Sequence, residues 1–284
     1  MNFMSIFDGY SSAMIALKKN GIEPENYFSS EVDEYAKKVS SANFPEIKQI
    51  GAVENIDTRK LPNIDILAGG SPCQGFSYAG KQLNFNDPRS ALFFEFVRIL
   101  KKVKPRYFLL ENVKMKHEYQ DIITEHLGVR PIEINSALVS AQNRSRLYWT
   151  NIPNISQPVD KGLTIKDVVK SDRDCCFSSA GRDTNKIRRL RAKTLKSSCL
   201  TARYYKGVKS DGAPFIYFGD KEKGSVFDYS EKSDYRMLTP IECELLQTVP
   251  KNYTNHVSNT QRYKMLGNGW TVDVIAHIFK NLET

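Results

Sequence analysis

Residues 64–70 read IDILAGG, an apolar run that predicts a buried β-strand over 64–68, followed by a glycine pair. A second apolar run, YFLL at residues 107–110, leads directly into Glu111. Between the two runs, residues 91–102 place apolar side chains at helical spacing, which predicts an amphipathic helix. A strand, a helix and a second strand in this order are typical of parallel α/β architecture.

The same alternation continues on both sides of this stretch. Further strands are predicted at residues 2–7, 27–31, 132–139 and 146–149, and further helices at residues 11–20 and 33–43. Alternation over some 150 residues predicts a largely parallel sheet covered on both faces. In such sheets the working residues lie at the carboxyl ends of the strands.

The sequence changes character after about Pro153. Short polar segments and turns rich in Gly, Asp and Lys continue to about Asp234, which predicts a smaller, irregular module that contains β-strands. Helical patterns return at residues 239–247 and 271–282. We therefore expect one part made of residues 1–154 and 234–284, and a second part made of residues 155–233.

The composition favours a cytosolic protein with a polyanionic partner. Of the 284 residues, 41 are Lys or Arg and 32 are Asp or Glu, a formal charge of +9, and residues 186–196 carry six cations without an acid. A solvated surface explains that run equally well. The N-terminus lacks the pattern of a signal peptide, and no apolar run is long enough to cross a membrane. The five cysteines are spaced neither as a disulfide framework nor as a zinc site.

Several predicted strands end in residues with chemical potential. The first strand leads into Phe7-Asp8-Gly9, and the second ends at Glu31. A turn glycine and a surface glutamate account for both without any ligand. The run Gly70-Ser71-Pro72-Cys73 is more informative, because a fixed proline before a cysteine holds a thiol in a defined place outside any apolar periodic run.

Three short motifs, taken with others, resemble the signatures of cytosine 5-methyltransferases. They are PCQ at 72–74, ENV at 111–113 and QNRSR at 142–146, in the order that this family has. Late motifs match as well, at 236–247 and 267–269. The resemblance covers nearly the whole chain except about 155–233, and it is strongest to the branch with phage enzymes and eukaryotic de novo DNA methyltransferases. It implies a Rossmann-like, S-adenosylmethionine-dependent methyltransferase sheet with a small, irregular target-recognition region.

The resemblance also implies the reaction and its catalytic residues. The thiolate of Cys73 would add to carbon 6 of a cytosine, which makes carbon 5 nucleophilic enough to accept a methyl group. Glu111 would contact ring nitrogen 3 and the exocyclic amine, while Arg144 and Arg146 would hold the base carbonyl and nearby backbone. Because carbon 6 is buried in stacked DNA, the base must first leave the duplex.

For S-adenosylmethionine, the resemblance implies a pocket of residues at several strand ends and late in the chain: Phe7, Gly9, Tyr10, Glu31, Val32, Asp57, Gly70, Pro72, Leu92, Asn268 and Gly269. Two features depart from the family pattern. Ser11 stands where relatives have a third small glycine, and Ala52 stands where many have an Asp that binds the adenine amine. Asp57 is the candidate to replace that acid.

For DNA, the resemblance makes phosphate contact by the basic run the favoured reading, with no metal involved. The residues expected to contact DNA are Gln74, Ser77, Gln82, Arg188, Arg189, Arg191, Thr201, Arg203 and Arg236. Double-stranded DNA is the expected partner, and a cognate restriction endonuclease is a further possible one. Two alternatives stay open: a tRNA cytosine methyltransferase, although the Cys-Phe-Thr tripeptide of that branch is missing, and a DNA-binding paralogue without catalysis.

Overall fold

The computed structural model describes residues 1–71, 88–169, 175–179, 187–189, 195–209, 213–218, 226–228 and 235–283. The chain forms two compact units. The first unit is Met1–Ile134, Ser145–Gln157 and Ile275–Thr284, and the second is Asn135–Arg144 and Pro158–Val274. The second unit therefore takes in more of the chain than the recognition region expected at 155–233, whose functional boundaries remain a prediction.

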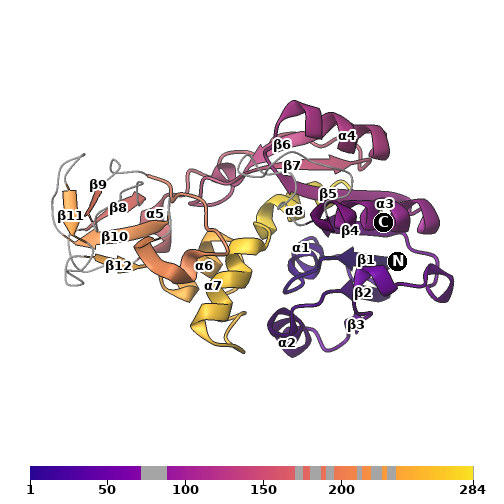
Figure 1. Ribbon diagram of the computed structural model, residues 1–284, viewed down its shortest axis with the longest axis horizontal. Helices are drawn as coiled ribbons and strands as arrows, with labels where there is room; N and C mark the ends of the chain where they lie inside the picture. Colours follow the sequence, from indigo (N-terminus) through magenta and orange to yellow (C-terminus); the bar gives the residue numbers. More distant parts are fainter. Residues whose placement is uncertain are drawn as a thin grey trace. The chain divides into compact units, whose positions relative to one another are not determined.

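A seven-stranded sheet organises the first unit. Its strands are β1 (Asn2–Ile6), β2 (Asn26–Ser30), β3 (Lys48–Gln49), β4 (Ile66–Gly70), β5 (Tyr107–Val113), β6 (Ile132–Asn135) and β7 (Ser145–Thr150). They lie in the order β3-β2-β1-β4-β5-β7-β6, and β1 to β5 run parallel (Figure 1). Only β7, among the pairs with described registers in this sheet, runs antiparallel to its neighbour, β5. The sheet confirms the predicted mainly parallel α/β fold.

Alternating side chains cover both faces of this sheet with apolar partners. On β1, Met4 and Ile6 belong to a core cluster that also includes Phe96 of helix α3 (Pro88–Val103). Phe3 points to the opposite face, where its ring stacks on Tyr27 and meets Phe279 of helix α8 (Val272–Phe279) edge-on. Five of these six side chains are completely buried, and the sixth, Tyr27, is 2% exposed. Strands with both faces buried are what a parallel sheet requires.

The other helices of this unit are α1 (Ser12–Lys19), α2 (Glu34–Asn43) and α4 (His117–Leu127). The first two match their predicted positions, but α4 was not predicted. Its apolar side chains are few, with only Ile123 and Leu127 buried, so the periodic pattern is weak. The strand predicted at 132–139 is too long: it ends at Asn135, where the Asn135 side chain accepts a hydrogen bond from the N–H of Ala137 and starts a 3₁₀ turn, Ser136–Leu138. The final helix also ends earlier than predicted, at Phe279.

The second unit contains short strands and helices, as expected for an irregular β-containing module. A three-stranded antiparallel sheet has the order β12-β10-β8, and a two-stranded one pairs β11 with β9 (Figure 1). The bounds are α5 (Ile165–Val168), β8 (Cys175–Ser179), β9 (Ile187–Arg189), β10 (Pro214–Phe218), β11 (Val226–Asp228), β12 (Tyr235–Met237), α6 (Pro240–Leu246) and α7 (Asn259–Asn268). Helix α6 begins with a capping box, in which Thr239 and Glu242 bind each other's backbone N–H groups.

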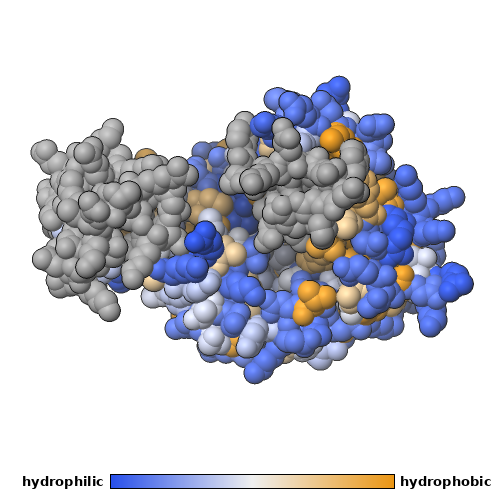
Figure 2. All heavy atoms as spheres, in the orientation of Figure 1, coloured by the Kyte–Doolittle hydropathy of each residue, from blue (hydrophilic) through white to orange (hydrophobic). Residues whose placement is uncertain are grey.

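Hydrophilic residues dominate the visible surface outside the grey atoms (Figure 2). The large exposed apolar side chains of the described residues include Val32 and Tyr35, at 68% and 49% exposure. Among the described residues, no helix is both long and apolar enough to cross a bilayer. Val32, which directly follows Glu31, is thus an exposed apolar side chain and also a predicted cofactor-site residue.

Candidate active site

A buried ion pair joins two of the predicted catalytic residues. Nε of Arg146 lies 2.9 Å from Oε1 of Glu111, and the two side chains are 14% and 10% exposed. The strand directions explain the meeting. Because β7 runs antiparallel to β5, the start of β7 lies beside the end of β5, where Val113 is paired with Arg146 and Glu111 with Tyr148. Glu111 lies within β5, two residues before its end, rather than just after it as predicted.

The neighbouring Asn112 ties this strand end to β4. Its Nδ2 donates to Oγ of Ser71 at 3.0 Å and to the Ser71 carbonyl at 3.4 Å, and both residues are almost fully buried. Ser71 immediately follows β4 and precedes Cys73 by two residues in the sequence. Cys73 itself, with Pro72, Gln74, Ser77 and Gln82, lies outside the described residues. The described part of the site is thus the acid, its arginine and the anchor at Ser71.

Arg144, which was predicted to act with Arg146, belongs to the second unit and has different partners. Its guanidinium donates to the carbonyl oxygens of Leu200 at 2.9 Å, Gly269 at 2.8 Å and Gly267 at 3.3 Å. Arg144 is 3% exposed, and no acid among the described residues pairs with it. Two of the carbonyls lie at the end of α7, where they lack helical partners and where positive charge is favourable. Arg144 also precedes β7, so the extended geometry assumed for both arginines holds only for Arg146.

The segment around Thr201 passes very close to the same helix end. A Cβ atom added to Gly267 would lie 2.1 Å from the carbonyl carbon of Thr201. Any side chain at this position would therefore collide with backbone. Gly267 is required for packing, a role that the resemblance did not indicate. Arg144 and Gly267 together hold the Leu200–Thr201 segment against the end of α7.

The turn after β1 has an uncommon backbone. Phe7, Gly9 and Ser11 all have positive φ angles, of 57°, 58° and 61°. Glycine adopts this left-handed region freely, whereas for other residues it costs about 1–2 kcal/mol. A turn with two non-glycine residues in this region needs compensating contacts, and such strain is commonest at functional sites.

Glu31, at the end of β2, forms one set of these contacts. One carboxylate oxygen accepts a hydrogen bond from the N–H of Gly9 at 2.7 Å. The other accepts from the N–H groups of Val32 and Asp33 at 2.7 and 2.8 Å. A carboxylate can accept about four hydrogen bonds, so these three leave room for about one more donor, such as a ribose hydroxyl.

Asp8 forms the second set, although it was not among the predicted site residues. Its carboxylate accepts hydrogen bonds from the hydroxyls of Ser11 at 2.6 Å and Tyr27 at 2.7 Å. Ser11 in turn contacts the Ser40 hydroxyl at 2.6 Å. Asp8 is 6% exposed, and this burial raises the pKa of its carboxyl group against the lowering effect of the hydroxyls. The only sign of this role in the sequence is that Asp8 is a charged residue inside the turn that follows the first strand.

The remaining predicted cofactor residues differ in accessibility. Asn268 and Val32 are exposed, Phe7, Gly70, Leu92 and Gly269 are partly exposed, and Tyr10 is buried at 1% exposure. Asp57, the predicted substitute for the missing acid, is engaged elsewhere. Both its oxygens bind the Arg59 guanidinium at 2.9 Å, and these contacts lower its pKa to about 2. It also accepts from the Arg59 N–H as the N-cap of a 3₁₀ helix, Thr58–Lys60.

The predicted DNA-contacting residues are only partly described. Thr201 and Arg203 are exposed. Arg236 forms a two-fold ion pair with Glu242, at 2.8 Å on each arm, and so supports the capping box of α6. Arg188 and Arg189 lie on β9, whose side chains are not described, and Arg191 lies outside the described residues. Lys196, the last cation of the basic run, donates to the carbonyls of Ala137 and Ser140.

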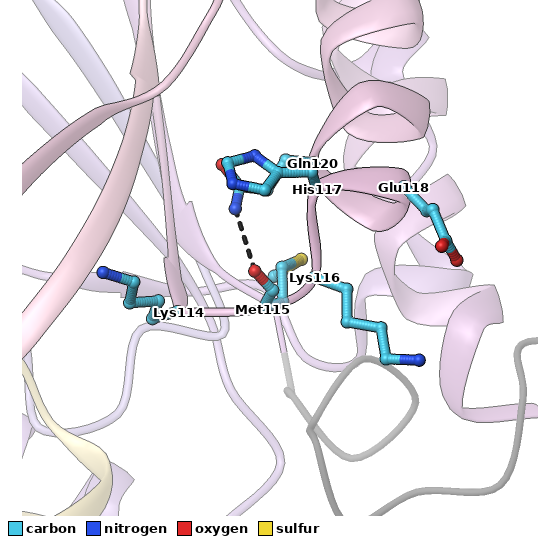
Figure 3. Close-up of a pocket in the computed structure, with 6 residues that line it drawn as sticks. All are labelled: Lys114, Met115, Lys116, His117, Glu118 and Gln120. Atoms are coloured by element: carbon cyan, nitrogen blue, oxygen red, sulfur yellow. Dashed lines mark hydrogen bonds between the residues drawn. The ribbon is translucent and has the colours of Figure 1, made fainter.

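A hollow beside the start of α4 is separate from these groups. Its lining comes from one continuous segment and consists of Lys114, Met115, Lys116, His117, Glu118 and Gln120 (Figure 3). Within it, the Gln120 side chain donates to the Met115 carbonyl at 2.8 Å. The hollow contains none of the predicted site residues, so it has no part in the candidate site.

Comparison with known proteins agrees with this geometry. The family model for C-5 cytosine-specific DNA methylase matches residues 1–284. The chain is 32% identical to the type II methyltransferase M.NgoBI of Neisseria gonorrhoeae, over 96% of this chain and 90% of that protein. It is also 32% identical to M1.ScrFI of Lactococcus lactis subsp. cremoris, over 91% and 72%. The solved structure of Entamoeba histolytica methyltransferase EhMeth has the same fold, with a TM-score of 0.77 at 20% identity and coverage of 100% and 99%. The chain belongs to the C-5 cytosine-specific DNA methylase family.

Proposed function

We propose that this protein transfers a methyl group from S-adenosylmethionine to carbon 5 of a cytosine flipped out of duplex DNA, through a covalent adduct with Cys73. The observation that carries the proposal is the buried Glu111–Arg146 pair, 2.9 Å apart, beside the Asn112–Ser71 contact. The acid and the guanidinium thus lie beside the end of β4, and Cys73 follows that end by three residues in the sequence. The acid can contact the exocyclic amine and ring nitrogen of a pyrimidine base, and the guanidinium can contact its carbonyl.

Each predicted catalytic residue has a role in the proposed reaction. The Cys73 thiolate forms a bond to carbon 6, and the electrons that this addition pushes into the ring are available at carbon 5. Glu111 contacts ring nitrogen 3 and the exocyclic amine, which favours the addition. Arg146 donates to the base carbonyl and stabilises the negative charge that develops there. After methyl transfer, a base removes the proton from carbon 5 and the thiol leaves carbon 6.

The structure leads us to assign the base-holding role to Arg146. Its guanidinium is bound to the reactive acid, whereas that of Arg144 is bound by three main-chain carbonyls. We assign Arg144 to the support of the Leu200–Thr201 segment. This assignment separates two residues that the motif alone presents as equivalent.

The residues at the ends of β1 and β2 suit S-adenosylmethionine, which when bound supplies a methyl group on a positively charged sulfur. Glu31 has capacity for about one further hydrogen bond, and the exposed Val32 beside it offers an apolar surface to a purine. A carboxylate next to an aliphatic surface is a suitable set of groups for a nucleoside. Phe7 and Gly9 would line the neighbouring turn.

The decisive experiment uses duplex DNA that contains 5-fluorocytosine. Fluorine cannot be removed as a proton can, so after methyl transfer the thiol stays bonded to carbon 6 and a protein–DNA adduct accumulates. We expect the wild-type protein and Cys175→Ser to form this adduct with S-adenosylmethionine present, and Cys73→Ser to form none. Adduct formation by Cys73→Ser, or none by cofactor-bound wild type on any DNA, contradicts the proposal.

The substrate and biological role follow from two further measurements. Labelled S-adenosylmethionine should transfer its methyl group to duplex DNA and not to tRNA, and preferential transfer to tRNA would favour the alternative branch. Bisulfite sequencing of DNA from cells that express the protein should show methylation within one short sequence. That pattern is expected of a restriction–modification enzyme, the role that the type II names of the relatives suggest.

A further inference from the structure

A chain of side-chain hydrogen bonds converges on the turn after β1. The Gln49 amide donates to the Ser40 hydroxyl at 3.3 Å, and the Ser40 and Ser11 hydroxyls are 2.6 Å apart. Since the single hydroxyl proton of Ser11 points to Oδ2 of Asp8, Ser40 must be the donor to Ser11. The chain therefore points in one direction, from β3 through α2 to the Asp8 carboxylate. The Tyr27 hydroxyl on β2 donates to the other Asp8 oxygen at 2.7 Å.

These contacts act on the residues with left-handed backbone. Ser11, with φ at +61°, is the N-cap residue of α1. Its side chain nevertheless makes no hydrogen bond to the N–H groups of the helix. Its hydroxyl is committed instead to Asp8 and Ser40. The backbone repeats the connection, because the N–H of Ser11 donates to the Asp8 carbonyl at 3.1 Å. Asp8 and Ser11 thus close the turn through both side chain and backbone.

The closed turn in turn holds Glu31. Gly9 lies between Asp8 and Ser11 in the sequence, and its N–H donates to Glu31 at 2.7 Å. The N–H of Asp8 donates to the carbonyl of Ser30, the residue before Glu31, at 3.2 Å. A change in the turn would therefore change the position of the carboxylate that the proposed cofactor needs.

We infer that Asp8 and Ser11 are a positioning pair for S-adenosylmethionine, in which the Asp8 carboxylate and Ser11 hydroxyl hold the Phe7–Ser11 turn and, through Gly9, the Glu31 carboxylate. The inference rests on the proposed function for the identity of the cofactor. It gives a physical reason for a serine with left-handed backbone at position 11. A hydroxyl bound to a buried acid fixes a backbone conformation that glycine reaches by its freedom alone.

The test measures S-adenosylmethionine binding by calorimetry without DNA, so it does not depend on turnover. Asp8→Asn should raise the Kd about 10-fold, which corresponds to about 1.4 kcal/mol, and raise the KM for the cofactor by a similar factor. The kcat at saturating cofactor should change much less, because no atom of Asp8 contacts the reacting groups in this scheme. Tyr27→Phe, which removes one of the two hydroxyl donors without a change of charge, should raise the Kd by a smaller factor.

A pair of substitutions at Ser11 separates positioning from folding. Ser11→Ala loses the hydroxyl and keeps the backbone strain, whereas Ser11→Gly loses the hydroxyl and relieves the strain. We expect Ser11→Gly to have the higher Tm without cofactor, while both variants bind S-adenosylmethionine more weakly than wild type. Thr150→Val, which removes the buried hydroxyl that binds the Phe108 carbonyl in the same sheet, is the matched control and should bind normally.

The outcomes distinguish this inference from the proposed function. If Asp8→Asn and Ser11→Gly bind the cofactor as wild type does, or if any loss follows Tm alone, the positioning role is wrong. If these variants bind weakly while wild-type protein methylates no nucleic acid, the positioning role stands and the proposed reaction fails.

Discussion

Asp8 in the first unit and Arg144 in the second are both buried ionisable residues that lack an oppositely charged partner among the described residues. Asp8 is held by the hydroxyls of Ser11 and Tyr27, and Arg144 by main-chain carbonyls. Glu111 and Arg146, by contrast, form an ion pair with each other. The difference teaches that this chain satisfies a buried charge in two ways, by dipoles or by an opposite charge, and the buried Glu244–Arg262 pair is a second example of the latter.

This comparison has a physical basis. Hydroxyl and carbonyl dipoles satisfy a buried charge without a second costly ion. A carboxylate and a guanidinium at a strand edge each keep capacity for a further hydrogen bond. The first arrangement suits a structural connection, and the second suits a site that must exchange partners when a base arrives.

Replacement of Arg144 by methionine should have the largest effect. It removes the charged donor of the hydrogen bonds to the carbonyls of Leu200 and Gly269, which keep only the contacts from Cys199 and Gln247. A hydrogen bond to a charged group contributes about 1.5–3 kcal/mol, so we expect the free energy of unfolding to fall by about 3 kcal/mol. Urea denaturation measures this change. The control is Arg106→Met, whose exposed pair with Glu283 should contribute at most about 1 kcal/mol. Equal losses in the two variants would remove the distinction between the two kinds of arginine.

Glu111→Gln should separate catalysis from stability. The amide can still donate an N–H to ring nitrogen 3 but cannot share a proton with it, so the thiolate addition is no longer assisted and kcat should fall about 100-fold, or about 2.7 kcal/mol. The amide oxygen still accepts a hydrogen bond from Arg146, so the free energy of unfolding should change by less than about 2 kcal/mol. Single-turnover methylation and urea denaturation measure the two quantities. Glu133→Gln, in an exposed pair with Lys114, should leave kcat unchanged, and a similar loss there would contradict the assignment.

The smallest effect concerns pH and Asp8. Burial raises the pKa of Asp8 in the folded state above its unfolded value, so the folded protein holds this proton more tightly. The stability from this group is therefore complete below about pH 4 and is lost as the pH rises through the folded pKa. Asp8→Asn removes that dependence. The titratable groups nearest to Asp8 are Tyr27, which binds it, and Glu31, which binds the next residue.

The measurement for this prediction is the difference in free energy of unfolding between wild type and Asp8→Asn, followed by urea denaturation from pH 4 to 8. The free energy of unfolding of wild type should fall relative to that of Asp8→Asn as the pH rises. A difference that is independent of pH would mean that Asp8 is not buried as an unpaired acid. The opposite slope would mean that the hydroxyls outweigh its burial.

Much of the first unit could be predicted from sequence because its strands are short apolar runs. Ile66–Gly70 and Tyr107–Val113 are buried on both faces, so their composition identifies them without knowledge of their neighbours. Helix α4 lacked this advantage, since few of its side chains are buried. The antiparallel direction of β7 was not predicted either, and that direction is what brings Arg146 to Glu111.

The candidate site was predictable as a set of residues but not as a set of contacts. Motif order identified Glu111, Arg144 and Arg146 together, yet only the structure separates the two arginines by their partners. Asp8 was missed because its importance comes from Tyr27 and Ser40, which lie 19 and 32 residues further along the chain. Asp57 was proposed from proximity in sequence, and its pairing with Arg59 could not be read from that proximity.

The contact between Gly267 and Thr201 has a consequence for protein engineering. The Thr201 backbone occupies the space where any side chain at position 267 would begin. A segment transplanted here from another methyltransferase must therefore follow the same backbone path at this point, whatever its side chains are. Exchange of exposed side chains such as Arg203 should therefore be tolerated better than insertions near residue 201. The contact with Gly267 therefore limits which segments can be exchanged at this position.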